Sequence, residues 1–220
     1  MTLREPPNAV DVIASGIHDA KNSMFDALTR IGIAMQAIHA GQAAAALPAL
    51  AETERAVAAS AERLSKLLSA YRLTRHENPV SMLPMDVGSL LEDVVLRVRA
   101  SGAEGIAITT ACQCDGFWVC DRELVADCLV NALQNALRHA RKQVRLTAAE
   151  VDGMLCLDVA DDGPGLPAEL PDHPDGTHSG VGLFIARRIA ELHQRHDRHG
   201  ELDLHNGGPL GGAVFALRLP

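Results

Sequence analysis

Asp161-Asp162-Gly163-Pro164-Gly165 is the stretch that decides the fold of this chain. It follows an apolar run over residues 155–160, so Asp161 stands at the end of a predicted strand. There its carboxylate can accept a hydrogen bond from an exocyclic amine such as that of adenine. Gly163 and Gly165 let the backbone turn sharply and approach a ligand without a Cβ in between. The stretch therefore predicts a ligand pocket at one end of a sheet.

Two further patterns extend this pocket. Gly180 and Gly182 open a predicted helix over residues 182–192, and the N–H groups at such a helix start can receive phosphate oxygens. Upstream, Asn131 and Asn135 lie four residues apart on another predicted helix and share one face. An amide oxygen on that face, that of Asn135, can ligate Mg²⁺ while the metal also holds phosphates. Together the patterns predict a site for ATP and Mg²⁺.

The carboxy-terminal part of the chain mixes predicted strands and helices. Short strand-like runs bounded by polar or turn residues predict strands, and apolar residues at three- and four-residue steps predict helices. The predicted strands are 106–110, 117–120, 144–148, 155–160, 202–205 and 213–219, and the predicted helices are 87–100, 121–140 and 182–192. This order predicts an α/β sandwich, with one sheet covered by helices on a single face.

The amino-terminal part predicts a helical hairpin. Apolar residues recur at helical spacing in two segments on either side of Gly41: Ile17, Met24, Leu28, Ile31, Met35 and Ile38, then Leu47, Leu50, Val57, Ala61, Leu64, Leu68 and Tyr71. Two long helices cannot bury two apolar faces by touching only each other, so we expect a dimeric four-helix bundle. The α+β chain thus comprises a hairpin over 1–78, a linker over 79–85 marked by prolines, and the sandwich over 86–220.

Composition narrows the classes of function. The 220 residues carry a formal net charge of -8, which gives little support to a nucleic-acid partner. No apolar run approaches the length of a membrane span and no signal pattern opens the chain, so we expect a cytoplasmic protein without a membrane partner.

The five cysteines fit reduced thiols. Four clustered histidines fit a solvated insertion better than a metal site: His193, His196, His199 and His205.

These residues carry a close family resemblance that covers nearly the whole chain. Four segments resemble the sequence boxes of GHKL ATPases, in the same order along the chain. The helix with Asn131 and Asn135 resembles the N box, and the DxGxG stretch resembles the G1 box. The run Gly180 to Leu183 resembles the G2 box, and Gly-Gly-Ala-Val-Phe at 211–215 resembles the G3 box. Bacterial sensor histidine kinases are the most similar branch, because His18-Asp19-Ala20-Lys21-Asn22 is similar to their phosphoacceptor box. The resemblance implies a homodimer whose ATP-binding domain delivers the γ-phosphoryl group to His18. An aspartate on a response regulator would be the next carrier.

The resemblance also implies roles for single residues. Asp19 lies beside His18 and can orient one ring nitrogen and take its proton, which leaves the other nitrogen as the nucleophile. Asn22 matches the position that places a water for dephosphorylating the partner. Arg138 falls where a basic residue reaches the phosphates, and His139 falls where many relatives carry an aromatic residue beside the nucleotide.

Three departures from the family pattern concern the first helix and the lid. Ser23 replaces a common proline, the predicted lid over 166–179 lacks a phenylalanine, and His178 replaces a glycine. Two alternatives to the kinase stay open: a degenerate phosphotransfer or scaffold dimer, and a GHKL serine kinase of the anti-sigma type. No sensor domain is recognised, so a separate sensory protein is an expected partner.

Overall fold

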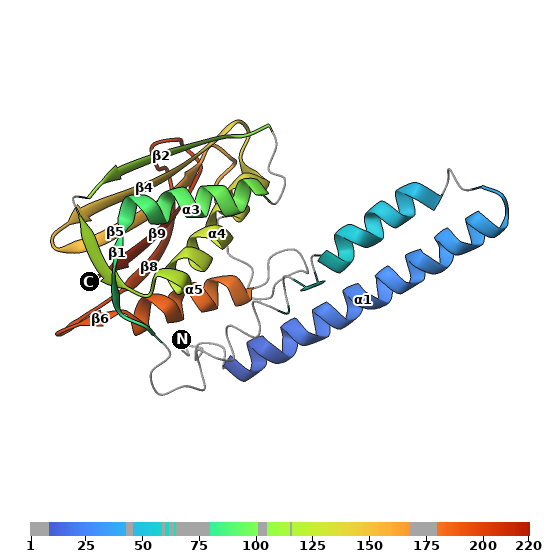
Figure 1. Cartoon of the computed structure of the whole chain (residues 1–220), viewed down its shortest axis with the longest axis horizontal. Coiled ribbons are helices and arrows are strands. Elements are labelled where there is room, and N and C mark those ends of the chain that lie inside the picture. The colour runs from blue at the N-terminus through green and yellow to red at the C-terminus, as the bar shows by residue number, and fades with distance from the viewer. Residues whose placement is uncertain are drawn as a thin grey trace. The chain divides into compact units, whose positions relative to one another are not determined.

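The computed structural model describes residues 9–42, 46–58, 60, 61, 64, 80–100, 105–114, 116–167 and 180–220. The chain divides into two compact units, Met1–Arg75 with His173–Val181 and His76–Asp172 with Gly182–Pro220. The first unit is helical and the second combines helices with a sheet (Figure 1). This arrangement confirms the predicted α+β class.

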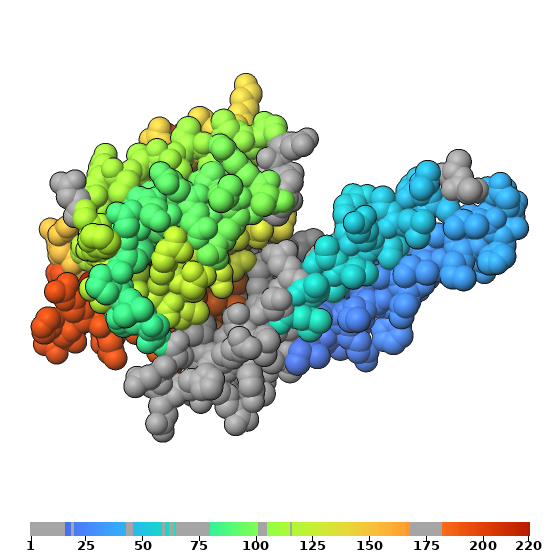
Figure 2. Space-filling model, viewed as in Figure 1, coloured from blue at the N-terminus to red at the C-terminus, as the bar shows by residue number. Residues whose placement is uncertain are grey.

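The helical unit is a hairpin of α1 (Ala9–His39) and a second helix over residues 46–58. Gly41 ends α1 in the left-handed region, with φ +75°, and its N–H donates to the carbonyl of Ile38. Polar contacts between the described parts of the helices include the Ser23 hydroxyl, which donates to the Ala56 carbonyl at 3.5 Å, and an ion pair between Arg30 and Glu52. Side chains of the two helices lie against each other in Figure 2.

Small side chains form the contact between these two helices. Apart from Gly16, the buried residues described on each helix recur every seven positions: Ala20, Ala27 and Ala34 on α1, and Ala46, Thr53 and Ser60 on the second. The large apolar residues of the predicted stripes are instead exposed within the single chain, among them Ile17, Met24, Leu28, Met35, Ile38, Leu47 and Val57. The hairpin therefore leaves its bulkiest apolar side chains without cover from the described part of its own chain.

The second unit is built on a five-stranded sheet in the order β2-β4-β5-β9-β8. Its strands are β2 (Ala107–Gln113), β4 (Gln143–Val151), β5 (Met154–Asp161), β8 (Glu201–Asn206) and β9 (Ala213–Leu219). The β2–β4 pair is parallel, and the other neighbours are antiparallel. Helices α3 (Val87–Ala100) and α4 (Arg122–His139) contact the sheet, and α5 (Gly180–Leu192) is the third helix of Figure 1.

Strand alternation places the core between the sheet and its helices. Val144, Leu146, Leu155 and Leu157 are fully buried, and they alternate with more exposed residues along β4 and β5. α4 adds an apolar face to this core: Val125, Ala126, Cys128, Leu129, Ala132, Leu133 and Ala136. The predicted sandwich is confirmed: β3 and β9 have the predicted bounds, and the other four predicted strands are two to four residues longer than expected.

Two expectations about irregular segments require correction. Part of the predicted linker is strand β1 (Leu83–Asp86), which pairs antiparallel with β3 (Phe117–Cys120). Pro84 is tolerated there because a two-stranded sheet consists only of edge strands. The predicted histidine-rich insertion contains a short hairpin of β6 (Gln194–Arg195) and β7 (Arg198–His199). Within the described residues, no helix combines the length and apolar character needed to cross a membrane.

Candidate functional site

Asp161 ends β5 and is only 5% exposed. Its Oδ1 accepts hydrogen bonds from the N–H of Gly163 at 2.8 Å and of Ala213 at 3.2 Å. The N–H of Gly212 donates to the Asp161 carbonyl at 3.0 Å. Among the described residues, no donor bonds its Oδ2. The DxGxG stretch and the β8–β9 loop thus hold the carboxylate through one of its two oxygens.

Close packing around Asp161 requires glycine at two positions of the stretch. A Cβ on Gly163 would lie 2.5 Å from the His139 carbonyl oxygen, which ends α4. Gly165 has φ +83°, and a Cβ there would lie 2.7 Å from Oδ1 of Asn206. The predicted role of these glycines in a sharp backbone turn agrees with the observed geometry.

Asp162 and Asn206 hold the stretch in place, and sequence reasoning assigned no role to either. Oδ1 of Asp162 accepts from the N–H of Arg141 at 2.8 Å and of Lys142 at 3.1 Å. Burial acts to raise the pKa of Asp162, but these backbone donors outweigh it, so the pKa is lowered. Asn206 exchanges hydrogen bonds with the backbone of Leu166, at 2.6 and 3.0 Å. Both contacts span 20 residues or more, so no local pattern could have shown them.

The polar face of α4 carries Asn131, Asn135 and Arg138, as the helical spacing predicted. The Arg138 guanidinium donates to Oδ1 of Asn135 at 3.1 Å. The amide oxygen expected to ligate a metal therefore has a protein partner in this structure. His139 follows on the last turn, with its side chain exposed.

His193 is fully buried, which corrects its placement in a solvated insertion. Its Nε2 accepts from the N–H of Asp121 at 3.0 Å, and its Nδ1 donates to the Ile189 carbonyl at 2.7 Å. Asp121 in turn caps α4 by accepting from the N–H of Leu124. His193 thus joins the end of α5 to the start of α4. Within the described part of the chain, no group of three or more metal-ligating side chains is found.

Gly180 and Gly182 lie in the first turn of α5, followed by Leu183. A Cβ on Gly182 would meet no described atom within 4 Å, so close packing does not require glycine there. Most of the predicted lid, including His178, lies outside the described residues.

The phosphoacceptor box lies on α1, where His18 and Asn22 are exposed on one face. Nδ2 of Asn22 lies 3.1 Å from Nδ1 of His18. This contact engages Nδ1, and among the described residues Nε2 has no hydrogen-bond partner. The side chain of Asp19 lies outside the described residues.

Comparisons with known proteins place the chain in a family. The family model for histidine kinase-, DNA gyrase B- and HSP90-like ATPases matches residues 120–220. The probable sensor histidine kinase HK of Mycobacterium tuberculosis (strain CDC 1551 / Oshkosh) is 32% identical over 192 residues, which cover 82% of this chain and 48% of that protein. The chain thus spans about half the length of this relative.

Two further proteins extend the comparison. Sensor histidine kinase component HK1 of Mycobacterium tuberculosis (strain H37Rv) is 33% identical over 147 residues, which cover 62% of this chain and 82% of that protein. The histidine kinase AdeS of Acinetobacter baumannii has a similar fold, with a TM-score of 0.65 and 16% identity over 88% of this chain and 94% of that one. The chain belongs to the sensor histidine kinase family and carries a GHKL-type ATP-binding domain.

Proposed function

We propose that this protein is an ATP-dependent histidine kinase that phosphorylates its own His18 and passes the phosphoryl group to an aspartate of a response regulator. The oriented Asp161 carboxylate carries the nucleotide part of this proposal. Its Oδ1 is held by two backbone donors, and Oδ2 is left for the exocyclic amine of adenine. A base without that amine would leave this buried oxygen unpaired, which is unfavourable.

The phosphates and Mg²⁺ are assigned to α4 and α5. Mg²⁺ needs few protein ligands because it keeps several waters and binds phosphate oxygens, so the single amide oxygen of Asn135 fits it. When bound, the metal would neutralise phosphate charge. Arg138 would give up its hydrogen bond to Asn135 and bind the phosphates. Charged phosphate oxygens form stronger hydrogen bonds with a guanidinium than the neutral amide oxygen of Asn135 does. Gly180, Gly182 and Leu183 provide the first turn of α5 for the same phosphates.

His18 is the proposed nucleophile. Nε2 would attack the γ-phosphorus with its lone pair, the bond to the β–γ bridging oxygen would break, and ADP would leave with those electrons. Attack requires the tautomer with its proton on Nδ1. The Asn22 amide, whose Nδ2 lies 3.1 Å from Nδ1, would turn away so that Nδ1–H donates to Asp19 instead. Asp19 is proposed to take the proton, and Asn22 to place a water during dephosphorylation of the regulator.

Homodimerisation is proposed because the hairpin exposes large apolar side chains. The side chains of Leu28 and Phe25 are 63% and 60% exposed in the single chain. A contiguous apolar face of this kind marks an interface. A second copy would bury it and complete a four-helix bundle. A separate sensory protein would supply the input.

The test is incubation with γ-labelled ATP and Mg²⁺, comparing wild type with His18→Ala and Asp161→Asn. We expect acid-labile, alkali-stable label in wild type and loss of label in both variants. His39→Ala is the matched control, because His39 is also exposed on α1 and also uses Nδ1 in a hydrogen bond, to Met35. Full labelling of His18→Ala would contradict the proposal.

Two other results would support the alternatives. A chain that takes no label from ATP but accepts phosphate from a phosphorylated regulator would be a phosphotransfer protein. Acid-stable label on an added protein would indicate a serine kinase.

A further inference from the structure

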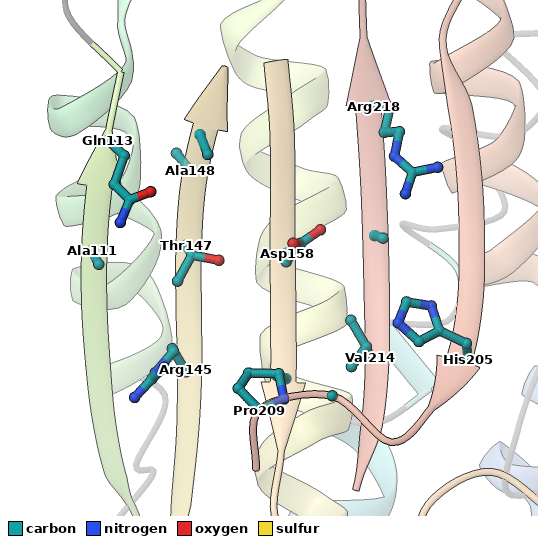
Figure 3. A pocket seen from close by; sticks show the side chains of 14 residues that line it. Ala111, Gln113, Arg145, Thr147, Ala148, Asp158, His205, Pro209, Val214 and Arg218 are labelled. Atoms are coloured by element: carbon teal, nitrogen blue, oxygen red, sulfur yellow. The ribbon is translucent and has the colours of Figure 1, made fainter. Parts of the chain in front are cut away.

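The sheet of the second unit has another face, opposite the buried row of Val144 and Leu146, and this face holds a cavity of about 460 Å³. Strand register sets one row of residues across it: Ala111, Thr147, Asp158 and Ala216 are successive partners on β2, β4, β5 and β9. Figure 3 shows these strands side by side with the lining side chains. The cavity size falls in the range of small-molecule sites.

One wall of the cavity is the β8–β9 loop. A Cβ on Gly208 would overlap Cγ2 of Val214, so the loop backbone presses directly on β9. Ala160, Val214 and Ala216 are buried as a separate cluster on this face. Pro209 lies over the end of β5 in Figure 3. The wall is thus packed before any ligand arrives, which lowers the ordering cost of binding.

Asp158 stands at the centre of the cavity floor, half-buried among alanines. In the described part of the chain its carboxylate makes no hydrogen bond and no salt bridge. Burial raises the pKa of Asp158, and the charges of Arg218 and His205 act against this. A carboxylate that is partly desolvated without a donor is unfavourable, so a ligand with a protonated amine would stabilise it.

Cationic side chains flank Asp158 on two opposite sides. Arg145 pairs in register with Ala160, and Arg218 pairs with Cys156, so the arginines lie two residues above and below Asp158 along β5. Among the described residues neither arginine forms a salt bridge, and both line the cavity. His205 pairs in register with Val214, in the row that also holds Arg145, and its Nδ1 lies 2.9 Å from Asp203 (Figure 3). The charges therefore run positive, negative, positive across the floor.

We propose that this cavity binds an acidic α-amino acid such as glutamate. Its ammonium group contacts Asp158, its α-carboxylate contacts Arg218, and its side-chain carboxylate contacts Arg145. By strand geometry the two arginine Cα atoms are roughly 16 Å apart, and their long side chains leave room for a ligand of this size between them. The central carboxylate disfavours a phosphate ligand, and the two arginines disfavour a polyamine.

The test is calorimetric titration of the full chain with L-glutamate, glycine and L-lysine. We expect saturable binding of glutamate by wild type at millimolar concentration. The affinity for glutamate should be weaker by about tenfold or more in Asp158→Asn and in Arg218→Gln, because each variant loses one charge-assisted hydrogen bond. Arg195→Gln is the control, because Arg195 is exposed on β6 and does not line the cavity. Thermal unfolding of each variant checks that it is folded.

A second comparison isolates Arg145. Wild type should prefer glutamate to glycine by about tenfold, and Arg145→Gln should lose this preference while still binding glycine. Three results would overturn the proposal: no saturable glutamate binding, equal affinity in Asp158→Asn, or an unchanged preference in Arg145→Gln. None of these measurements depends on ATP or on His18.

Discussion

In the helical unit the buried side chains are alanine, threonine and serine, whereas the sandwich buries leucine, isoleucine and valine. The sandwich holds its large apolar residues between the sheet and the helices. The hairpin exposes most of its large residues and uses small ones at the contact between helices. Small side chains allow close approach of two helices but remove little apolar area from water. The difference indicates that the sandwich buries its large apolar residues within one chain, whereas the described hairpin does not, which supports the dimer proposed above.

The largest expected effect is in the sandwich core. Leu157→Ala removes a fully buried side chain from β5 and should lower the free energy of unfolding by about 2–5 kcal/mol. Urea denaturation followed by circular dichroism measures this change. Val151→Ala is the control, because Val151 is half-exposed at the end of β4 and should cost far less. Equal losses would mean that the sandwich is not packed as described.

The next largest expected effect is a loss of stability when the contact between the two hairpin helices is overpacked. Ala27 is 2% exposed, so Ala27→Leu should force the two helices apart and cost about 1–3 kcal/mol. Gln36→Leu, at an exposed position of α1, should cost little. Thermal unfolding of both variants compares them. If Ala27→Leu were as stable as Gln36→Leu, the two helices would not meet at Ala27.

The apolar surface of the hairpin should act on association rather than on folding. Full burial of a leucine is worth about 1.5–3 kcal/mol, so Leu28→Ser should weaken the dimer by about tenfold or more. Sedimentation equilibrium measures the dissociation constant, and Asp26→Ser on the same turn is the polar control. An unchanged constant for Leu28→Ser would place the dimer contact elsewhere.

The smallest expected effect is a change in how the stability of the sandwich depends on pH. Burial lowers the pKa of His193 from its ordinary value of 6.5, against the opposing effects of the Ile189 carbonyl and of Asp121. Below about pH 6.5 the unfolded chain then binds a proton that the folded chain does not, so stability falls as the pH decreases. His193→Gln should flatten this part of the pH profile, whereas His199→Gln, at an exposed position, should not. Denaturation midpoints between about pH 8 and pH 5 measure the slope, and equal slopes in all three proteins would contradict this role.

Much of the sandwich was predictable because its patterns are local. The asparagine pair of α4 and the glycines of the DxGxG stretch follow from spacing and backbone conformation. Asp162, Asn206 and His193 act through hydrogen bonds to residues 20 to 72 positions away, which no window of sequence contains. The hairpin contact was missed for another reason: hydrophobic periodicity weighs large side chains, and the residues that meet there are small.

Asp161 is proposed to accept a hydrogen bond from the exocyclic amine of adenine. Calorimetry with ATP and inosine triphosphate, which lacks this amine, tests it most directly in wild type and in Asp161→Asn. We predict that wild type binds ATP at least tenfold more tightly than inosine triphosphate, and that the variant loses this preference. Equal binding of the two nucleotides by wild type would contradict the account.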